Sequence, residues 1–174
     1  MLLSLPKLGA WEQKMTVSIR RAEETDTETL LPLFLEMQHH YEGAAAIDAE
    51  TARPRLLAAL KPQPGRAILG AFEDEALGLA CLYELFPGPD MHPAWLLKEL
   101  YVAASARGRR IGEALLREAA RLALAEGGAR LDLTTAGDNE AAQRFYARVG
   151  MTPIAKVYYR SEGAALLDLA EDRG

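Results

Sequence analysis

The sequence predicts an α/β fold in which a mixed, mostly antiparallel sheet carries helices on both faces. Two β-rich runs, 66–72 and 76–86, are joined by three polar residues, which is typical of an antiparallel hairpin. A strand over 94–103, a helix over 108–126 and a strand over 130–135 form a right-handed crossover, which makes those two strands parallel. One sheet with both kinds of pairing needs helices on either side to cover its apolar faces.

The segments before the hairpin predict one strand and two helices. Alternating apolar and polar residues favour a strand over 17–21. Thr25 or Asp26 can cap the first helix, along which apolar residues recur at helical spacing. A second helix starts at Asp48, and Pro54 lies far enough inside it that an irregular first turn is expected.

The segments after the crossover predict a helix over 138–149, one or two strands within 151–161 and a short helix over 162–170. The complete predicted order is β-α-α-β-β-β-α-β-α-β.

Composition and charge describe one globular domain. The chain has 174 residues and a mass of 19.0 kDa, with 49% hydrophobic and 26% charged residues, which are ordinary globular values. The net charge of −5 argues against a nucleic-acid partner and suits a cationic substrate, although it is also an ordinary charge for solubility. No apolar run approaches the roughly 20 residues of a membrane-spanning helix, so we expect no membrane partner.

The N-terminal residues show no pattern that links them to the rest of the chain. We therefore expect an N-terminal extension over 1–15 and one domain over 16–174. Residues 1–14 are a loosely attached extension, a segment upstream of a natural start at Met15, or a short docking arm. The single cysteine, Cys81, alternates with leucines as a core residue does, and a lone cysteine fits a cytoplasmic location. The three histidines do not have the spacing of metal ligands, so no metal site is predicted.

The stretch richest in chemistry is the loop 107–112, Arg-Gly-Arg-Arg-Ile-Gly, which leads from a strand directly into a long helix. A helix N-terminus has unpaired N–H groups and the positive end of the helix dipole, so this turn is suited to bind phosphate. A tight turn with a basic, solvated first helical turn is the alternative. Neither a Gly-Lys-Ser/Thr phosphate loop nor a GxGxxG motif is present, which argues against a nucleoside-triphosphate or dinucleotide enzyme.

A second motif, Asn-Glu-Ala-Ala-Gln-Arg-Phe-Tyr-Ala-Arg-Val-Gly-Met, covers 139–151. Together with the strand 99–102 and the loop 107–112, it resembles the GNAT superfamily of acetyl-CoA-dependent N-acetyltransferases, whose element order matches about residues 16–170. The family loop reads Gln/Arg-x-x-Gly-x-Gly/Ala, so Arg110 stands where the inner glycine is usual. We expect Arg110 to have a right-handed helical conformation, which requires no glycine. The tail 156–167 resembles the polyamine (spermidine/spermine) acetyltransferase branch.

The resemblance implies acetyl-CoA as co-substrate, with its pyrophosphate on the amides of the loop and its body in the splay between the two parallel strands. It assigns acetyl-CoA contacts to Leu100, Tyr101, Val102, Arg107, Gly108, Arg109, Arg110, Ile111, Gly112, Asn139, Phe145 and Tyr146. The Asn139 amide would contact the pantetheine arm, although a plain helix cap is the alternative. The Val102 N–H would stabilise the oxyanion.

The resemblance also implies the catalytic groups. Tyr146 would protonate the departing thiolate from a position facing the cleft, while Phe145 points to the core. Glu99 would take the proton of the amine, directly or through water. By strand alternation Glu99 is expected to share an apolar face with Leu97 and Tyr101. A solvated edge charge is the alternative for Glu99.

The acceptor side is assigned to the end of the first helix, where His39, His40 and Tyr41 would contact the substrate. Partners of the helix dipole are the alternative for the two histidines. We expect a small cationic or amino-acid-like primary amine; acetylation of a protein N-terminus or lysine and a non-catalytic acetyl-CoA-binding module are the alternatives. A homodimer is expected because a strand over 153–160, rich in Tyr and Val, would leave an exposed edge.

Overall fold

The computed structural model describes residues 17–171, which fall into two units divided at Thr134. The expected extension over 1–15 therefore lies outside the described residues. The strands are β1 (Ser18–Arg21), β2 (Arg66–Phe72), β3 (Ala76–Leu85), β4 (Ala94–Val102) and β5 (Arg130–Leu133). The helices are α1 (Thr27–Glu42), α2 (Ala49–Leu60), α3 (Ile111–Ala125), α4 (Glu140–Arg148) and α5 (Ala164–Ala170). Short 3-10 turns cover Glu24–Asp26, Gly43–Ala45, Pro89–Met91 and Ala104–Ala106.

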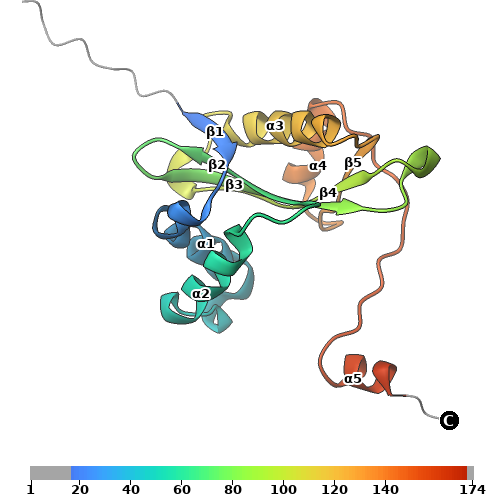
Figure 1. Ribbon diagram of the computed structural model, residues 1–174, viewed down its shortest axis with the longest axis horizontal. Helices are drawn as coiled ribbons and strands as arrows, with labels where there is room; N and C mark the ends of the chain where they lie inside the picture. The colour runs from blue at the N-terminus through green and yellow to red at the C-terminus, as the bar shows by residue number, and fades with distance from the viewer. Residues whose placement is uncertain (1–16, 172–174) are drawn as a thin grey trace, which may run out of the picture. The chain divides into compact units, whose positions relative to one another are not determined.

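The first unit contains a five-stranded mixed sheet in the order β1-β2-β3-β4-β5 (Figure 1). The first three pairings are antiparallel, and β4 and β5 are parallel, as the hairpin and the crossover predict. The parallel pairing is short and extends from Ala94 opposite Arg130 to Leu97 opposite Leu133. The fold class predicted from the sequence is thus confirmed.

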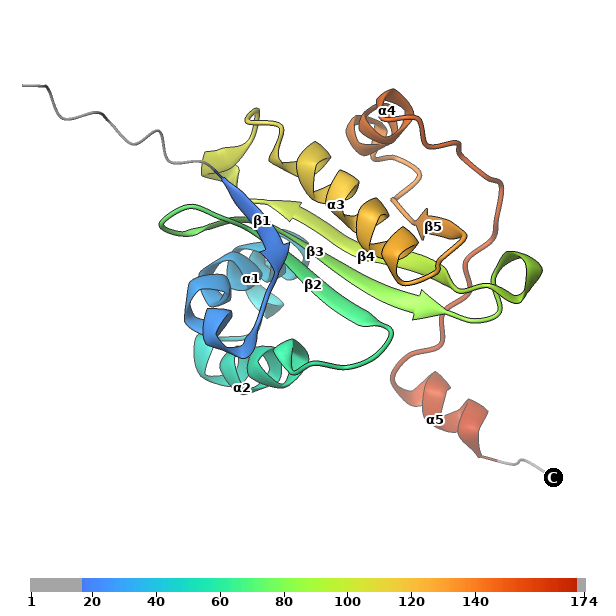
Figure 2. The ribbon, with the colours of Figure 1, turned by 45° about the horizontal axis from the view of Figure 1, so that its top comes forward.

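Helices cover both faces of this sheet. Figure 1 shows α1 and α2 on one side and α3 on the other, and Figure 2 shows α3 running along β3 and β4. α3 approaches β3 closely at Gly78, where an added Cβ would lie 2.9 Å from Leu115 Cδ1. The residues of α3 that face the sheet are buried: Ile111, Leu115, Leu116, Ala119 and Ala123. Those buried on α1 are Thr27, Leu30, Leu31, Leu33 and Met37.

The helix ends follow their local sequence. The Asp48 carboxylate caps α2 by accepting a hydrogen bond from the Thr51 N–H at 2.8 Å. Gly43 follows α1 with a φ of +55°, which glycine adopts without a steric penalty. Pro54 does not disturb α2, which is helical from Ala49 onward, so the expected irregular first turn is absent.

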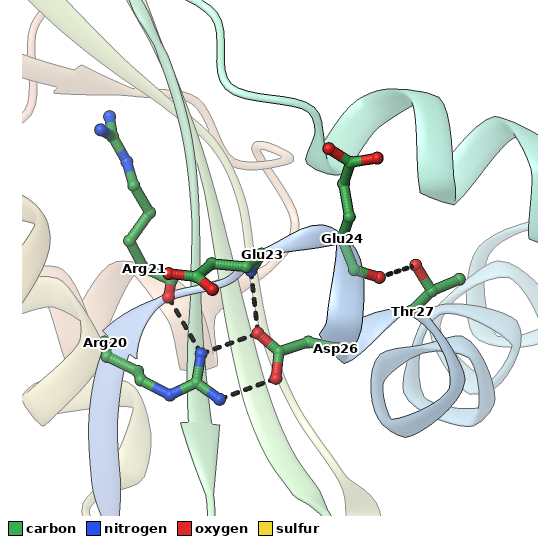
Figure 3. A network of polar contacts seen from close by, with 6 residues as sticks. All are labelled: Arg20, Arg21, Glu23, Glu24, Asp26 and Thr27. Carbon is green, nitrogen blue, oxygen red and sulfur yellow. Dashed lines mark hydrogen bonds and ion pairs between the residues drawn. The ribbon is translucent and has the colours of Figure 1, made fainter.

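The entry to α1 is held by an ion pair between β1 and the turn before the helix (Figure 3). Two nitrogens of the Arg20 guanidinium donate to the two carboxylate oxygens of Asp26, each at 2.7 Å. The same carboxylate accepts the Glu23 backbone N–H at 2.8 Å. The hydrogen bonds from Arg20 hold the pKa of the buried Asp26 carboxyl below its usual value, and the bond from the Glu23 N–H lowers it further. The network therefore fixes the angle at which the chain leaves the sheet.

The second unit contains α4, a segment without strands and α5. The prediction of one or two strands within 151–161 is wrong, because no residue from 151 to 161 has strand structure. Residues with strand propensity form a strand only where a neighbouring strand satisfies their backbone hydrogen bonds, and no described strand pairs with this segment. Its large side chains are mostly exposed instead, including Tyr158 at 76% and Tyr159 at 87%.

Within residues 17–171, no helix is both long enough and apolar enough to cross a membrane. The same part of the chain has no group of three His, Cys, Asp or Glu side chains that could hold a metal ion.

Candidate active site

The candidate site is organised by a bulge in β4. Leu97 pairs with Leu82 of β3, but Glu99 pairs with the adjacent Cys81, so Lys98 is an extra residue in the ladder. Because Cys81 and Leu82 are neighbours on β3, they face opposite sides of the sheet, and so do their partners. The expectation that Glu99 shares a face with Leu97 is therefore wrong.

Glu99 lies on the side of the sheet that α1 covers. Tyr101, two residues further along β4, is on the same face and donates a hydrogen bond to Glu36 of α1 at 3.0 Å. Leu97 and Leu100 lie on the opposite face, toward α3, which packs there against Gly78. The bulge thus turns the Glu99 carboxylate away from α3 and toward the end of α1.

The surroundings of Glu99 are polar rather than apolar. Its side chain is 25% exposed, and its Oε1 lies 2.7 Å from the Lys98 ammonium. Partial burial raises the pKa of the Tyr41 hydroxyl, and the negative charge of Glu99 raises it further. Burial, again with the charge of Glu99, raises the pKa of the Cys81 thiol to about 12. The thiol is therefore protonated near neutral pH.

Two of the three residues predicted on the acceptor side join this group. The His40 ring lies 5.2 Å from the Tyr41 ring and 6.0 Å from the Tyr101 ring, measured between centroids. His39 differs, because its Nδ1 lies 3.3 Å from the Gly43 carbonyl oxygen at the end of α1. The structure therefore brings His40 and Tyr41 together with Glu99 and Tyr101, whereas His39 has the role of a helix-end partner.

Glu36 is a site residue that the sequence analysis missed. Its Oε1 accepts hydrogen bonds from the Tyr101 hydroxyl at 3.0 Å and from the Ala104 backbone N–H at 2.8 Å. Burial, followed by the bond to Glu36, raises the pKa of Tyr101. The signal in the sequence is its spacing, because Glu36 lies one helical turn before His40 and so faces the same way.

The outer edge of β4 is unpaired where the site lies. The Ala103 N–H donates to the Leu77 carbonyl of β3, so the neighbouring pair Gly78–Val102 is of the non-hydrogen-bonded type. The N–H of Val102 consequently points away from β3. Pairing with β5 has already ended at Leu97, so within the described residues no strand pairs with Val102 on that side.

The loop that follows β4 has two residues with left-handed backbone. Gly108 has a φ of +80°, and Arg110 has φ +61° and ψ +16°. The expected right-handed conformation of Arg110 is therefore wrong, and α3 begins at Ile111 instead of Gly108. A non-glycine residue pays about 1–2 kcal/mol for this conformation, and such strain concentrates at ligand sites. Successive N–H groups in such a turn form a concave site that favours anions.

The three arginines of this loop have different partners. The Arg109 guanidinium forms an ion pair with Glu73 of the β2–β3 turn. Arg107 donates from Nε to the Val102 carbonyl at 3.4 Å and lies 6.0 Å from the centre of the Tyr101 ring. The Arg110 side chain is 86% exposed and lies 3.8 Å from Glu113. An added Cβ on Gly108 would meet nothing within 4 Å, so the loop is open at that point.

The remaining predicted residues of the loop differ in exposure. Ile111 is buried in the core, so only its backbone is available to a ligand, whereas Gly112 is half-buried.

The second motif forms α4 within the second unit. Asn139 caps this helix, because its Oδ1 accepts a hydrogen bond from the Ala142 N–H at 3.1 Å. This is the helix-cap role given above as the alternative for Asn139. The rings of Phe145 and Tyr146 lie 5.1 Å apart, and both residues are half-buried. No residue of α4 is buried, so Phe145 does not have the core position expected for it.

A cavity of about 410 Å³ lies elsewhere, between the end of β1, the end of α2 and the start of β2. Arg21, Lys61 and Arg66 are among its lining residues. None of the catalytic or binding residues predicted from the sequence lines it.

Comparison with known proteins identifies the chain as an acyltransferase. The model of the acetyltransferase (GNAT) family matches residues 27–151, and the chain belongs to that family. The chain is 28% identical to the uncharacterized N-acetyltransferase YhfO of Bacillus subtilis over 134 residues, which are 77% of this chain and 89% of that protein.

Solved structures share the fold of this chain. An integron cassette protein from the mobile metagenome of V. cholerae, VCH_CASS6, has a TM-score of 0.80 and 32% identity over 91% of this chain and 99% of that one. The aminoglycoside N-acetyltransferase AAC(6')-Iy, solved in complex with CoA, has a TM-score of 0.72 and 18% identity over 88% of this chain and 99% of that one. The last likeness concerns the fold alone.

Proposed function

We propose that this acetyltransferase moves the acetyl group of acetyl-CoA to a small cationic or amino-acid-like primary amine. The observation that carries the proposal is the end of β4. There the Val102 N–H points to an unpaired edge, and the strained, arginine-rich loop 107–112 follows within a few residues. An N–H donor beside an anion-binding loop is what acyl transfer from a phosphate-bearing thioester requires.

The loop residues fit the pyrophosphate of acetyl-CoA. The open space at Gly108 allows a phosphate to approach the backbone, and Arg107 and Arg110 supply exposed positive charge. Arg109 supplies charge only to the extent that it leaves Glu73. When bound, acetyl-CoA supplies the activated acetyl group. Its acetyl and pantetheine parts would then be held by the backbone of Leu100, Tyr101 and Val102. The second motif would contribute contacts from Asn139, Phe145 and Tyr146.

The acceptor amine would enter on the α1 side. Its ammonium would meet the Glu99 carboxylate, with His40 and Tyr41 beside it. Glu99 would accept the ammonium proton directly or through water, and the free amine would attack the thioester carbonyl while Val102 N–H stabilises the oxygen. Tyr146 would donate its hydroxyl proton to the departing sulfur.

The test is thiol release from acetyl-CoA with a panel of amines. Spermidine, a basic amino acid, a neutral amine and a lysine peptide separate the candidates. Faster turnover of the small cationic amines supports the proposal. Activity confined to the peptide would favour the alternative of protein acetylation, and no release with any amine would contradict the proposal.

We further propose one acetyltransferase domain over 16–174, preceded by an extension over 1–15, and a cytoplasmic location on the basis of the single buried thiol. A homodimer is proposed on a different ground from a strand edge. Large apolar side chains are exposed in and before α5, including Val157, Tyr158 and Leu169, and such patches favour association. Light scattering at micromolar concentration tests this, and a monomer would contradict it.

A further inference from the structure

We propose that Glu36 is a positioning residue that fixes the end of β4 and the acetyl-CoA loop from the acceptor side; the inference rests on the proposed function. One carboxylate oxygen accepts both the Tyr101 hydroxyl at 3.0 Å and the Ala104 N–H at 2.8 Å. These two donors flank Val102, whose N–H is the proposed oxyanion donor. Glu36 thus binds the chain on both sides of the reacting point.

The Ala104 bond orients the backbone that leads to the loop. Ala104 is the first residue of the 3-10 turn Ala104–Ala106, and its preceding residue Ala103 provides no side-chain cap. The first N–H groups of a helical turn have no partner within it, so a carboxylate from outside supplies the missing acceptor. Without Glu36, nothing else in the described residues accepts this N–H. The turn then loses its anchor four residues before Gly108.

The Tyr101 bond orients the other side. Tyr101 is only 6% exposed, and its ring lies beside both His40 of α1 and Arg107 of the loop. A buried phenol needs a hydrogen-bond acceptor, and Glu36 is the one it has. The carboxylate therefore holds a ring that lies beside a residue of each substrate's proposed site.

The experiment compares Glu36→Ala with Glu28→Ala, a matched control on the same helix. Glu28 forms an exposed ion pair with Arg53 of α2, away from β4. In the free protein, amide hydrogen exchange over 102–110 should become about tenfold faster or more in Glu36→Ala, because a charged hydrogen bond to the segment is lost. Exchange over this segment should not change in Glu28→Ala. Equal exchange in the two variants would overturn the proposal.

Binding of free CoA, followed by calorimetry, provides a second readout. The dissociation constant should rise about tenfold in Glu36→Ala and should not change in Glu28→Ala. Glu36→Gln keeps an acceptor oxygen and should recover most of the affinity. A CoA affinity in Glu36→Ala within twofold of the unsubstituted protein would overturn the proposal.

These readouts separate the inference from the proposed function. If the unsubstituted protein binds no CoA or acetylates no amine, the proposed function fails, while hydrogen exchange still decides the role of Glu36. If Glu36→Ala does not fold, Glu36→Asp replaces it, because its shorter carboxylate cannot reach both donors. Faster exchange over 102–110 in Glu36→Asp is then expected, and unchanged exchange would overturn the proposal.

Discussion

Leu97 and Glu99 are two residues apart on β4 and face opposite sides of the sheet. In a regular strand they would lie on one face, but their partners Leu82 and Cys81 are adjacent on β3, so Lys98 is an extra residue on β4 between them. The bulge lets β4 place an apolar residue under α3 and a carboxylate beside α1. Bulges commonly redirect a side chain next to a functional site.

Replacing Glu99 by Gln should lower kcat more than it changes the KM for acetyl-CoA. The amide is nearly the same size but cannot accept the ammonium proton, and general base catalysis is worth about 10²–10⁴-fold. Steady-state kinetics with the best amine measure this. Glu118→Gln on α3, where Glu118 pairs with Arg121, is the control. A kcat within about threefold of the unsubstituted enzyme would point to a water chain ending on another group.

Tyr146→Phe should lower kcat by about 10²–10⁴-fold while CoA binding changes little. The hydroxyl is needed only as charge develops on sulfur, whereas the ring that packs beside Phe145 is kept. Kinetics and calorimetry together separate the two effects. An almost unchanged kcat would mean that another group is the acid.

Arg107→Glu should weaken CoA binding about tenfold at low salt, because it places a negative charge beside the phosphates. Arg109→Glu should also weaken binding, and it removes the ion pair with Glu73 as well. Added salt should reduce both differences. Calorimetry at two ionic strengths measures them, with Arg121→Glu on α3 as a control for charge alone. If the loop variants lose no more CoA affinity than the Arg121→Glu control, this loop is not the phosphate site.

Arg110→Gly should raise the free energy of unfolding by about 1 kcal/mol, because glycine adopts a φ of +61° without strain. Arg117→Gly, inside α3, should instead lower the free energy of unfolding by about 1 kcal/mol. Urea unfolding measures both. If the two variants are equally destabilised, Arg110 does not have left-handed backbone in solution.

Asp26→Asn should lower the free energy of unfolding by about 1.5–3 kcal/mol near neutral pH, since it breaks a charged hydrogen-bond pair with Arg20. The folded-state pKa of Asp26 lies below 3.8, so its contribution is complete above that pH and is lost as the pH falls through the folded value. Urea unfolding at about pH 7 and at about pH 2–3 should therefore show a smaller difference between the two proteins in acid. A difference independent of pH would contradict this.

The sequence by itself determined the order and type of the elements up to α4, as well as the positions of the loop and of the Asn139 motif. These depend on local signals: helical spacing in α3, the polar turn between β2 and β3, and the capping residues Asp48 and Asn139.

Only the tertiary structure decided the features that depend on pairing between distant segments. The bulge at Lys98 appears only where β4 pairs with β3, so alternation along β4 alone correctly placed Glu99 with Tyr101 but wrongly placed it with Leu97. The left-handed Arg110 follows from the turn that joins β4 to α3. The segment 151–161, rich in Tyr and Val, has strand propensity, but no strand within residues 17–171 pairs with it. Glu36 acquires its role from two donors more than sixty residues away, and no local pattern encodes a contact of that range.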